Sequence, residues 1–205
     1  MANGNTRKDE RGAVMKKIDF ENLSEKFQEI CASSAWTDFA DKFLNARRVY
    51  VIGNGGLHFT AAHAATDCTR LIDDKTVVSM DTTGFITSCA NDYGYENLFI
   101  KWIESTALST EMGESMVIGM SCSGNSKNIT RALSWAENKG FSTTMISGRK
   151  SKRLSSQIHE VVLECEYFHT VEVLSLMLFY QLIHDAGSEC PSILKEVKRK
   201  DPWAV

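Results

Sequence analysis

Two short segments combine glycine with hydroxyl or amide side chains in a pattern that suits phosphate binding. In the first, Gly-Met-Ser-Cys-Ser-Gly-Asn-Ser at 119–126, an apolar run ends in serines immediately before a helical pattern. A helix N-terminus favours an anion, and serine hydroxyls donate hydrogen bonds to phosphate oxygens without adding charge. The alternative interpretation is an ordinary helix cap with turn serines.

The second segment is Gly-Asn-Gly-Gly at 53–56, which follows the apolar run Val49–Ile52. In a parallel sheet both segments open at the same carboxyl edge, which is where ligands bind. Neither fits a nucleotide motif, because GxGxxG requires glycine where His58 stands and no Gly-Lys-Ser/Thr follows. The pattern therefore predicts a small phosphorylated ligand and no dinucleotide.

The elements that must position these segments alternate between strand and helix patterns. Apolar, β-prone runs predict five strands, at 49–52, 75–80, 114–121, 141–147 and 160–163. Helical spacing predicts two amphipathic N-terminal helices from residue 19, then helices at 58–72, 84–106, 127–140 and 171–186. This alternation predicts an α/β fold, a three-layer αβα sandwich with a mostly parallel, flavodoxin-like five-stranded sheet.

Composition bounds the domain organisation and the partners. We expect a polar leader at 1–15, one domain at 16–187 and a short basic tail at 188–205. A net charge of −3 gives no broad positive field for nucleic acid, and no apolar run approaches the length that spans a bilayer. The start does not resemble a signal peptide, so a cytoplasmic protein without membrane or nucleic-acid partners is predicted.

The final predicted helix, 171–186, is apolar around most of its circumference. Together with the amphipathic N-terminal helices, it has more apolar surface than one small sheet covers. A homodimer or homotetramer is therefore predicted.

Three motifs in order resemble the sugar isomerase (SIS) domain family, and most closely its phosphoheptose isomerase branch. They are Ile-Gly-Asn-Gly-Gly at 52–56, Asn-Asp-Tyr-Gly-Tyr-Glu at 91–96 and Ser-Cys-Ser-Gly-Asn-Ser at 121–126, and the similarity spans residues 20–186. The resemblance implies an SIS-type fold and a sugar phosphate ligand. The substrate-binding residues that it implies are Ser121, Cys122, Ser123 and Ser126, with Asn54, Gly55, Gly56 and Asp92 nearby. Cys122 stands where threonine is usual.

The same resemblance assigns candidate catalytic residues to the helix after the glycine segment. His63 matches the family's histidine and Asp67 stands where a glutamate is usual, four residues later on the same helical face. The family's last helix supplies a glutamine and, eight residues on, a histidine, and alignment puts Val171 and Phe179 there. Because neither side chain transfers a proton or binds a metal, the usual mechanism and a metal site are predicted to be absent.

Glu172 is the remaining candidate for the base that moves a proton between C1 and C2. It resembles in position a glutamate that other aldose–ketose isomerases of this fold carry at the start of the last helix. His169 is a candidate for ring opening or for protonating a sugar oxygen. The alternatives are a glutamate that only complements the helix dipole and a structural histidine.

Two functions of different class follow. The first is a sugar-phosphate aldose–ketose isomerase that needs no added cofactor. The second is a phosphosugar-binding or protein-interaction module without catalysis.

Overall fold

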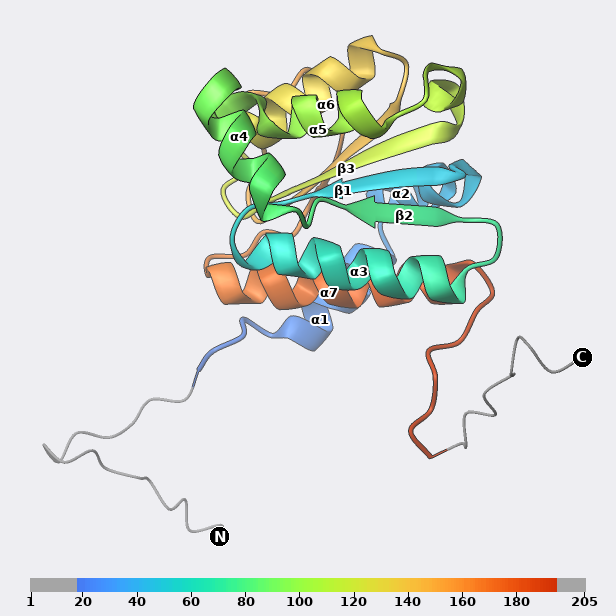
Figure 1. Ribbon diagram of the computed structural model, residues 1–205. Coiled ribbons are helices and arrows are strands. Elements are labelled where there is room, and N and C mark those ends of the chain that lie inside the picture. Colours follow the sequence, from blue (N-terminus) through green and yellow to red (C-terminus); the bar gives the residue numbers. More distant parts are fainter. Residues whose placement is uncertain (1–17, 195–205) are drawn as a thin grey trace, which may run out of the picture.

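A computed structural model of the protein, which describes residues 18–194, contains a sheet of five strands between two layers of helices (Figure 1). The strands are β1 (Arg48–Ile52), β2 (Thr76–Ser79), β3 (Ser115–Ser121), β4 (Ser142–Ser147) and β5 (His159–Val162). Every neighbouring pair is parallel, and the order is β2-β1-β3-β4-β5. The predicted parallel α/β sandwich is confirmed, with the strand order of flavodoxin-like folds.

The order of the strands brings the two glycine-containing segments together. The chain leaves β1 toward β2 on one side, whereas β3 lies on the other side and continues to β4. Ile52 at the end of β1 is paired with Gly119 of β3, so residues 53–56 and 121–126 emerge side by side. Such a switch point leaves a crevice at the carboxyl edge of the sheet.

The helices divide between the two faces of the sheet. One apolar cluster joins the sheet to α1 (Leu23–Cys31), α2 (Ser34–Asn45), α3 (Gly56–Leu71) and α7 (Phe168–Asp185). The other joins it to α4 (Thr83–Tyr93), α5 (Leu98–Thr106) and α6 (Lys127–Asn138). Short 3₁₀ turns lie at Tyr95–Asn97 and Ser109–Glu114. In Figure 1, α1, α3 and α7 lie below the sheet and α5 and α6 above it.

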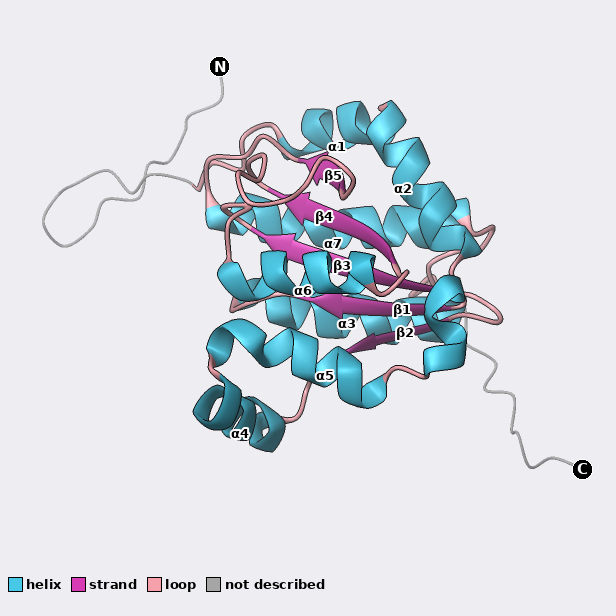
Figure 2. Cartoon of the chain, turned by 90° about the horizontal axis from the view of Figure 1, so that it is seen from above, coloured by secondary structure: helices cyan, strands magenta, loops and turns pink. Residues whose placement is uncertain are grey.

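The predicted continuous helix at 84–106 is wrong, because the structure contains two helices there. Gly94 has a φ of +79°, which ends α4, and a 3₁₀ turn leads into α5. Only Cys89 of α4 is buried, and Figure 2 shows this helix projecting from the edge of the molecule. The interruption turns Tyr95 back toward the sheet, which matters for the site described below.

Residues 18–22 form an N-terminal strap across the start of α7. The Glu21 carboxylate accepts hydrogen bonds from the backbone N–H groups of Glu166 (2.7 Å) and Tyr167 (3.1 Å). Burial raises the pKa of Glu21, but the hydrogen bonds to its carboxylate outweigh this and lower the pKa overall. Glu21 thus holds the two residues that precede α7, whose N-cap residue, Tyr167, makes no side-chain cap of its own.

The predicted leader at 1–15 and residues 195–205 of the predicted tail lie outside the described residues. The predicted domain boundaries therefore stay predictions. Within residues 18–194, no helix combines the length and the apolar character needed to cross a membrane.

Candidate functional site

A cavity of about 230 Å³ lies at the carboxyl ends of β1 and β3. Its walls come from the two glycine-containing segments, from the end of β3 and from the first residue of α7. The lining residues are Asn54, Leu57, Met120, Ser121, Cys122, Ser123, Ser126 and Phe168. Five of the predicted ligand-binding residues are thus brought to one cavity.

The phosphate loop, residues 121–126, is held in a tight turn. The backbone N–H of Gly124 donates to the carbonyl of Ser121 at 3.1 Å, with Gly124 at a φ of +68°. A side chain at Gly124 would also collide with the Arg149 carbonyl oxygen, so glycine is needed both for the turn and for the close approach. The hydroxyl of Ser126 lies 3.0 Å from that of Ser121 and does not cap α6. The N-terminus of α6 therefore meets the cavity without a side-chain cap, which is the geometry that attracts an anion.

An amide pair holds the loop after β1 against α6. Asn54 Nδ2 donates to Asn128 Oδ1 at 2.9 Å, and Asn128 Nδ2 donates back to Asn54 Oδ1 at 2.8 Å. Tyr95 Oη donates to the same Asn54 oxygen at 2.9 Å. These contacts fix the Asn54 amide at the cavity wall, and one of its two N–H donors remains for a ligand.

Sequence reasoning missed Asn128 and Tyr95. Tyr95 lies inside the quoted motif at 91–96, from which the resemblance implies Asp92 instead. Asp92 is exposed, accepts a hydrogen bond from its neighbour Asn91 at 2.8 Å and does not line the cavity. The glycine that ends α4 explains this outcome, because it directs the residues after it, and not those before it, toward β1.

Glu172 lies beside the cavity, against the start of α3. A Cβ at Gly56 would lie 2.6 Å from Glu172 Oε2 and closer still to the other carboxylate oxygen, so only glycine permits this approach. Gly55, at a φ of +57°, is the N-cap of α3 and provides no side-chain cap. The half-buried carboxylate thus lies at a helix N-terminus, where its negative charge is favourable.

Cys122, which lines the cavity, also lies close enough to Glu172 to be affected by its charge. Burial raises the pKa of its thiol to about 11, and the negative charge of Glu172 contributes. The thiol is therefore protonated at neutral pH and is a poor nucleophile. Phe168, one helical turn before Glu172, lines the cavity.

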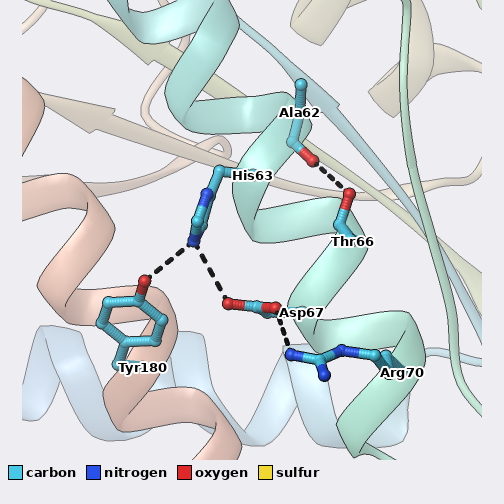
Figure 3. A network of polar contacts seen from close by, with 6 residues as sticks. All are labelled: Ala62, His63, Thr66, Asp67, Arg70 and Tyr180. Atoms are coloured by element: carbon cyan, nitrogen blue, oxygen red, sulfur yellow. Dashed lines mark hydrogen bonds and ion pairs between the residues drawn. The ribbon is translucent and has the colours of Figure 1, made fainter.

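His63 and Asp67 meet as predicted, in a polar network that also includes α7 (Figure 3). His63 Nε2 lies 2.9 Å from Tyr180 Oη and 3.2 Å from Asp67 Oδ2. The other Asp67 oxygen accepts from Arg70 Nη2 at 2.9 Å. Burial, followed by the charge of Asp67, raises the pKa of Tyr180. The network begins seven residues after Gly56, or roughly 10 Å along α3, and does not line the cavity.

Alignment placed the family's last-helix glutamine and histidine at Val171 and Phe179. Both side chains point into the core and are 1% exposed. At the same eight-residue spacing, Glu172 and Tyr180 face α3 instead. The polar pair on the face of α7 that meets α3 is therefore Glu172 and Tyr180, one residue after the aligned positions. An almost uniformly apolar helix lacks the polar pattern that fixes which side faces a neighbour.

His169 is engaged by the N-terminal strap. Its Nε2 lies 2.9 Å from the carbonyl oxygen of Asp19, and its ring contacts Phe20 edge-on at 5.2 Å. It is not among the residues that line the cavity. In residues 18–194 no three or more His, Cys, Asp or Glu side chains are grouped so as to hold a metal ion.

The sheet order and the serine-rich loop at the switch point define a flavodoxin-like α/β protein with a candidate anion site at the carboxyl edge of its sheet. No protein-family model matches the chain. A phosphoheptose isomerase of Buchnera aphidicola is 27% identical over 150 residues, which cover 70% of this chain and 76% of the relative. The phosphoheptose isomerase structure from Neisseria gonorrhoeae has a TM-score of 0.69 at 18% identity and covers 82% of this chain and 92% of its own.

A third neighbour is the Vibrio vulnificus NanR protein complexed with ManNAc-6P. It has a TM-score of 0.56 at 16% identity and covers 80% of this chain and 58% of its own. The fold of the chain is that of an SIS domain, and its sequence is similar to phosphoheptose isomerases.

Proposed function

We propose that this protein binds a sugar phosphate and interconverts its aldose and ketose forms, as an enzyme of carbohydrate metabolism. The observation that carries the proposal is the carboxylate of Glu172 beside a serine-lined cavity at the N-terminus of α6. Sequence similarity to phosphoheptose isomerases supports a phosphosugar of heptose or related size.

The phosphoryl group is assigned to the cavity. The hydroxyls of Ser121, Ser123 and Ser126 and the uncapped start of α6 offer hydrogen-bond donors from several directions. Asn54, held by its amide pair, is positioned to bind a sugar hydroxyl. Gly56 leaves room for the Glu172 carboxylate beside the cavity.

The isomerisation itself is a proton transfer between neighbouring carbons. A base removes the proton from C2 of the aldose and returns it to C1, while the proton on oxygen moves from O2 to O1 through an enediol. One carbon is oxidised as its neighbour is reduced, so no external oxidant or cofactor is required. We assign Glu172 as this base, because it is a half-buried carboxylate beside the phosphate site.

His63, with Asp67, is proposed to act on the O1 and O2 protons, at the same end of the sugar as Glu172. Its imidazole is oriented by Asp67 and Tyr180, and its side chain is 54% exposed. A homodimer or homotetramer, in which a second subunit covers this network, is proposed as well. Large exposed apolar side chains near α3 and α7 support it, among them Phe59 (75%) and Phe168 (71%). The cytoplasmic location and the absence of a nucleic-acid partner stay predictions.

The test is ligand binding followed by product analysis. Thermal shifts are measured against hexose, pentose and heptose phosphates, and NMR then follows any ligand for isomerised product and for exchange of the C2 hydrogen with solvent. We expect stabilisation with turnover, a Glu172→Gln variant that keeps the stabilisation but loses exchange, and a Ser123→Ala variant that loses much of the stabilisation. Unchanged turnover in Glu172→Gln removes that residue from the mechanism, and indifference to every sugar phosphate refutes the proposal.

A second candidate function is a phosphosugar-binding module without catalysis. It is favoured by the engagement of both Asp67 oxygens, one by His63 and one by Arg70, and by the NanR neighbour complexed with ManNAc-6P. Stabilisation by a sugar phosphate without product or C2 exchange would establish this function.

A further inference from the structure

Positive charge is concentrated in one part of the chain. Residues 122–159 contain seven Lys or Arg side chains and a single acidic one, Glu137, although the whole chain has a net charge of −3. The seven are Lys127, Arg131, Lys139, Arg149, Lys150, Lys152 and Arg153. The strongest run is Gly-Arg-Lys-Ser-Lys-Arg at 148–153, directly after β4.

Five of these side chains adjoin the phosphate loop, and we call Lys127, Arg149, Lys150, Lys152 and Arg153 the basic rim. Lys127 directly follows Ser126, which lines the cavity. The backbone N–H of Lys152 donates to Asn125 Oδ1 at 3.0 Å, and the Arg149 carbonyl packs against Gly124. The segment that carries four of the five charges is therefore fixed directly on the phosphate loop.

The rim side chains are exposed, and the Glu160 carboxylate, which accepts a hydrogen bond from the backbone N–H of Ser151 at 2.8 Å, forms an ion pair with none of them. In residues 18–194 none of the five side chains takes part in an ion pair or a side-chain hydrogen bond. Like charges held together in this way repel one another, and the repulsion is relieved when an anion approaches. Lys127, Arg131 and Arg153 also line a surface hollow of about 660 Å³ on the outer side of α6, so the positive surface continues beyond the cavity.

We propose that the basic rim attracts phosphorylated ligands to the cavity and selects dianionic phosphate esters over uncharged sugars. The inference rests on the proposed function only in taking a phosphate group as the ligand of the cavity. A phosphomonoester carries close to two negative charges at neutral pH. At 10 Å in water, each rim charge then raises the local ligand concentration about 1.7-fold at 0.1 M salt and about 2.7-fold at 0.01 M salt.

The test compares two double variants that remove equal charge. Lys150→Gln/Lys152→Gln removes two rim charges, whereas Lys42→Gln/Lys139→Gln removes two charges elsewhere. Lys139 follows the last residue of α6, 12 residues or roughly 18 Å from Lys127, and Lys42 lies on α2. The dissociation constant for inorganic phosphate is measured by calorimetry at about pH 8.5 and three salt concentrations, with thermal unfolding as a check on folding.

We expect the rim variant to bind phosphate about sevenfold more weakly at 0.01 M salt and about threefold more weakly at 0.1 M, with no difference at 1 M. The control variant should stay within about 1.5-fold of the unchanged protein at 0.1 M salt, because Lys139 lies farther from the loop than the screening length there, and at 0.01 M it should weaken binding less than the rim variant does. Equal weakening in both variants, a difference that survives 1 M salt, or no phosphate binding by the unchanged protein would overturn the proposal.

Two further measurements distinguish the rim proposal from the proposed enzyme activity and from a polyanion-binding site. Phosphate binding that depends on the rim, without isomerisation of any sugar phosphate, leaves the rim proposal intact and refutes the enzyme. A single-stranded RNA oligonucleotide that binds more tightly than phosphate and through the same lysines would instead make this surface a polyanion site and overturn the proposal.

Discussion

Replacing Gly56 with alanine should displace the Glu172 carboxylate while leaving the fold intact. The added Cβ would lie 2.6 Å from Oε2 and closer to Oε1, whereas real Cβ atoms essentially never approach other atoms within 3.0 Å. Relief therefore needs a movement of about 1 Å by the end of a flexible side chain. Gly56 is not in the left-handed region, so alanine introduces no backbone strain there.

The effects on stability and on activity should separate. Alanine is the better helix former by at most about 1 kcal/mol, and rotating the carboxylate away offsets part of that gain, so the melting temperature should change by only a few degrees. A misplacement of about 1 Å in a reacting group costs about 100-fold in rate. We therefore expect kcat for the isomerisation to fall about 100-fold, with phosphate binding retained.

The matched control is Gly84→Ala, because Gly84 also lies near the start of a helix and has open space where the new Cβ would stand. Both variants are assayed by NMR for turnover and C2 exchange, by calorimetry for phosphate binding and by thermal unfolding. Full kcat in Gly56→Ala, or an equal loss in Gly84→Ala, would refute the assignment of Glu172 as the base.

Three further substitutions test the supports of the site. Asn128→Ala leaves the Asn54 amide without its main partner and should reduce the free energy of unfolding by about 1–3 kcal/mol, measured by urea denaturation, with weaker phosphate binding. Glu21→Gln should make the stability of the protein depend less on pH in the acid range. The pKa of Glu21 in the folded state is lowered below 4.5, so the stabilisation by its carboxylate is present above that value and is lost as pH falls through the folded-state pKa. Identical acid melting profiles of the variant and the unchanged protein would contradict this. The buried Lys75 ammonium donates to the carbonyls of Phe43 (2.6 Å), Leu44 and Ala46 at the end of α2. Lys75→Met should therefore reduce the free energy of unfolding by about 2 kcal/mol, measured by urea denaturation. An unchanged midpoint would show that those carbonyls are satisfied without the ammonium.

The sheet and the phosphate loop were predictable because their signals are local. Each strand is a short apolar run bounded by polar or glycine-containing turns, and the parallel arrangement then brings 53–56 and 121–126 to one edge. The position of Ser121 and Ser126 at this edge was predicted in this way, since a residue directly after a strand has little freedom to lie elsewhere, whereas Asn54 was implied by the resemblance of residues 52–56 to the family's motif.

The missed features depend on contacts between distant parts of the chain. Which face of α7 meets α3 is set by packing around an apolar helix, so the contact of Tyr180 with His63 was not predicted. His169 was interpreted without knowledge that residues 18–22 cross α7. Tyr95 reaches Asn54 only because Gly94 interrupts the helical segment, an event that helical periodicity does not record.

The N-terminal strap has a consequence for the order in which the molecule is built. The Glu21 carboxylate holds the backbone of Glu166, 145 residues later in the chain, and the first turn of α7 that it supports carries Phe168, one wall of the cavity. Contacts of such long range form late in folding, because the loop that they close must be ordered first. During synthesis Glu21 leaves the ribosome long before its partner exists, so the strap closes only when nearly all of the described chain has been made. The strap is therefore expected to close after the sheet has formed, and the ability to bind phosphate should appear in refolding only after that step.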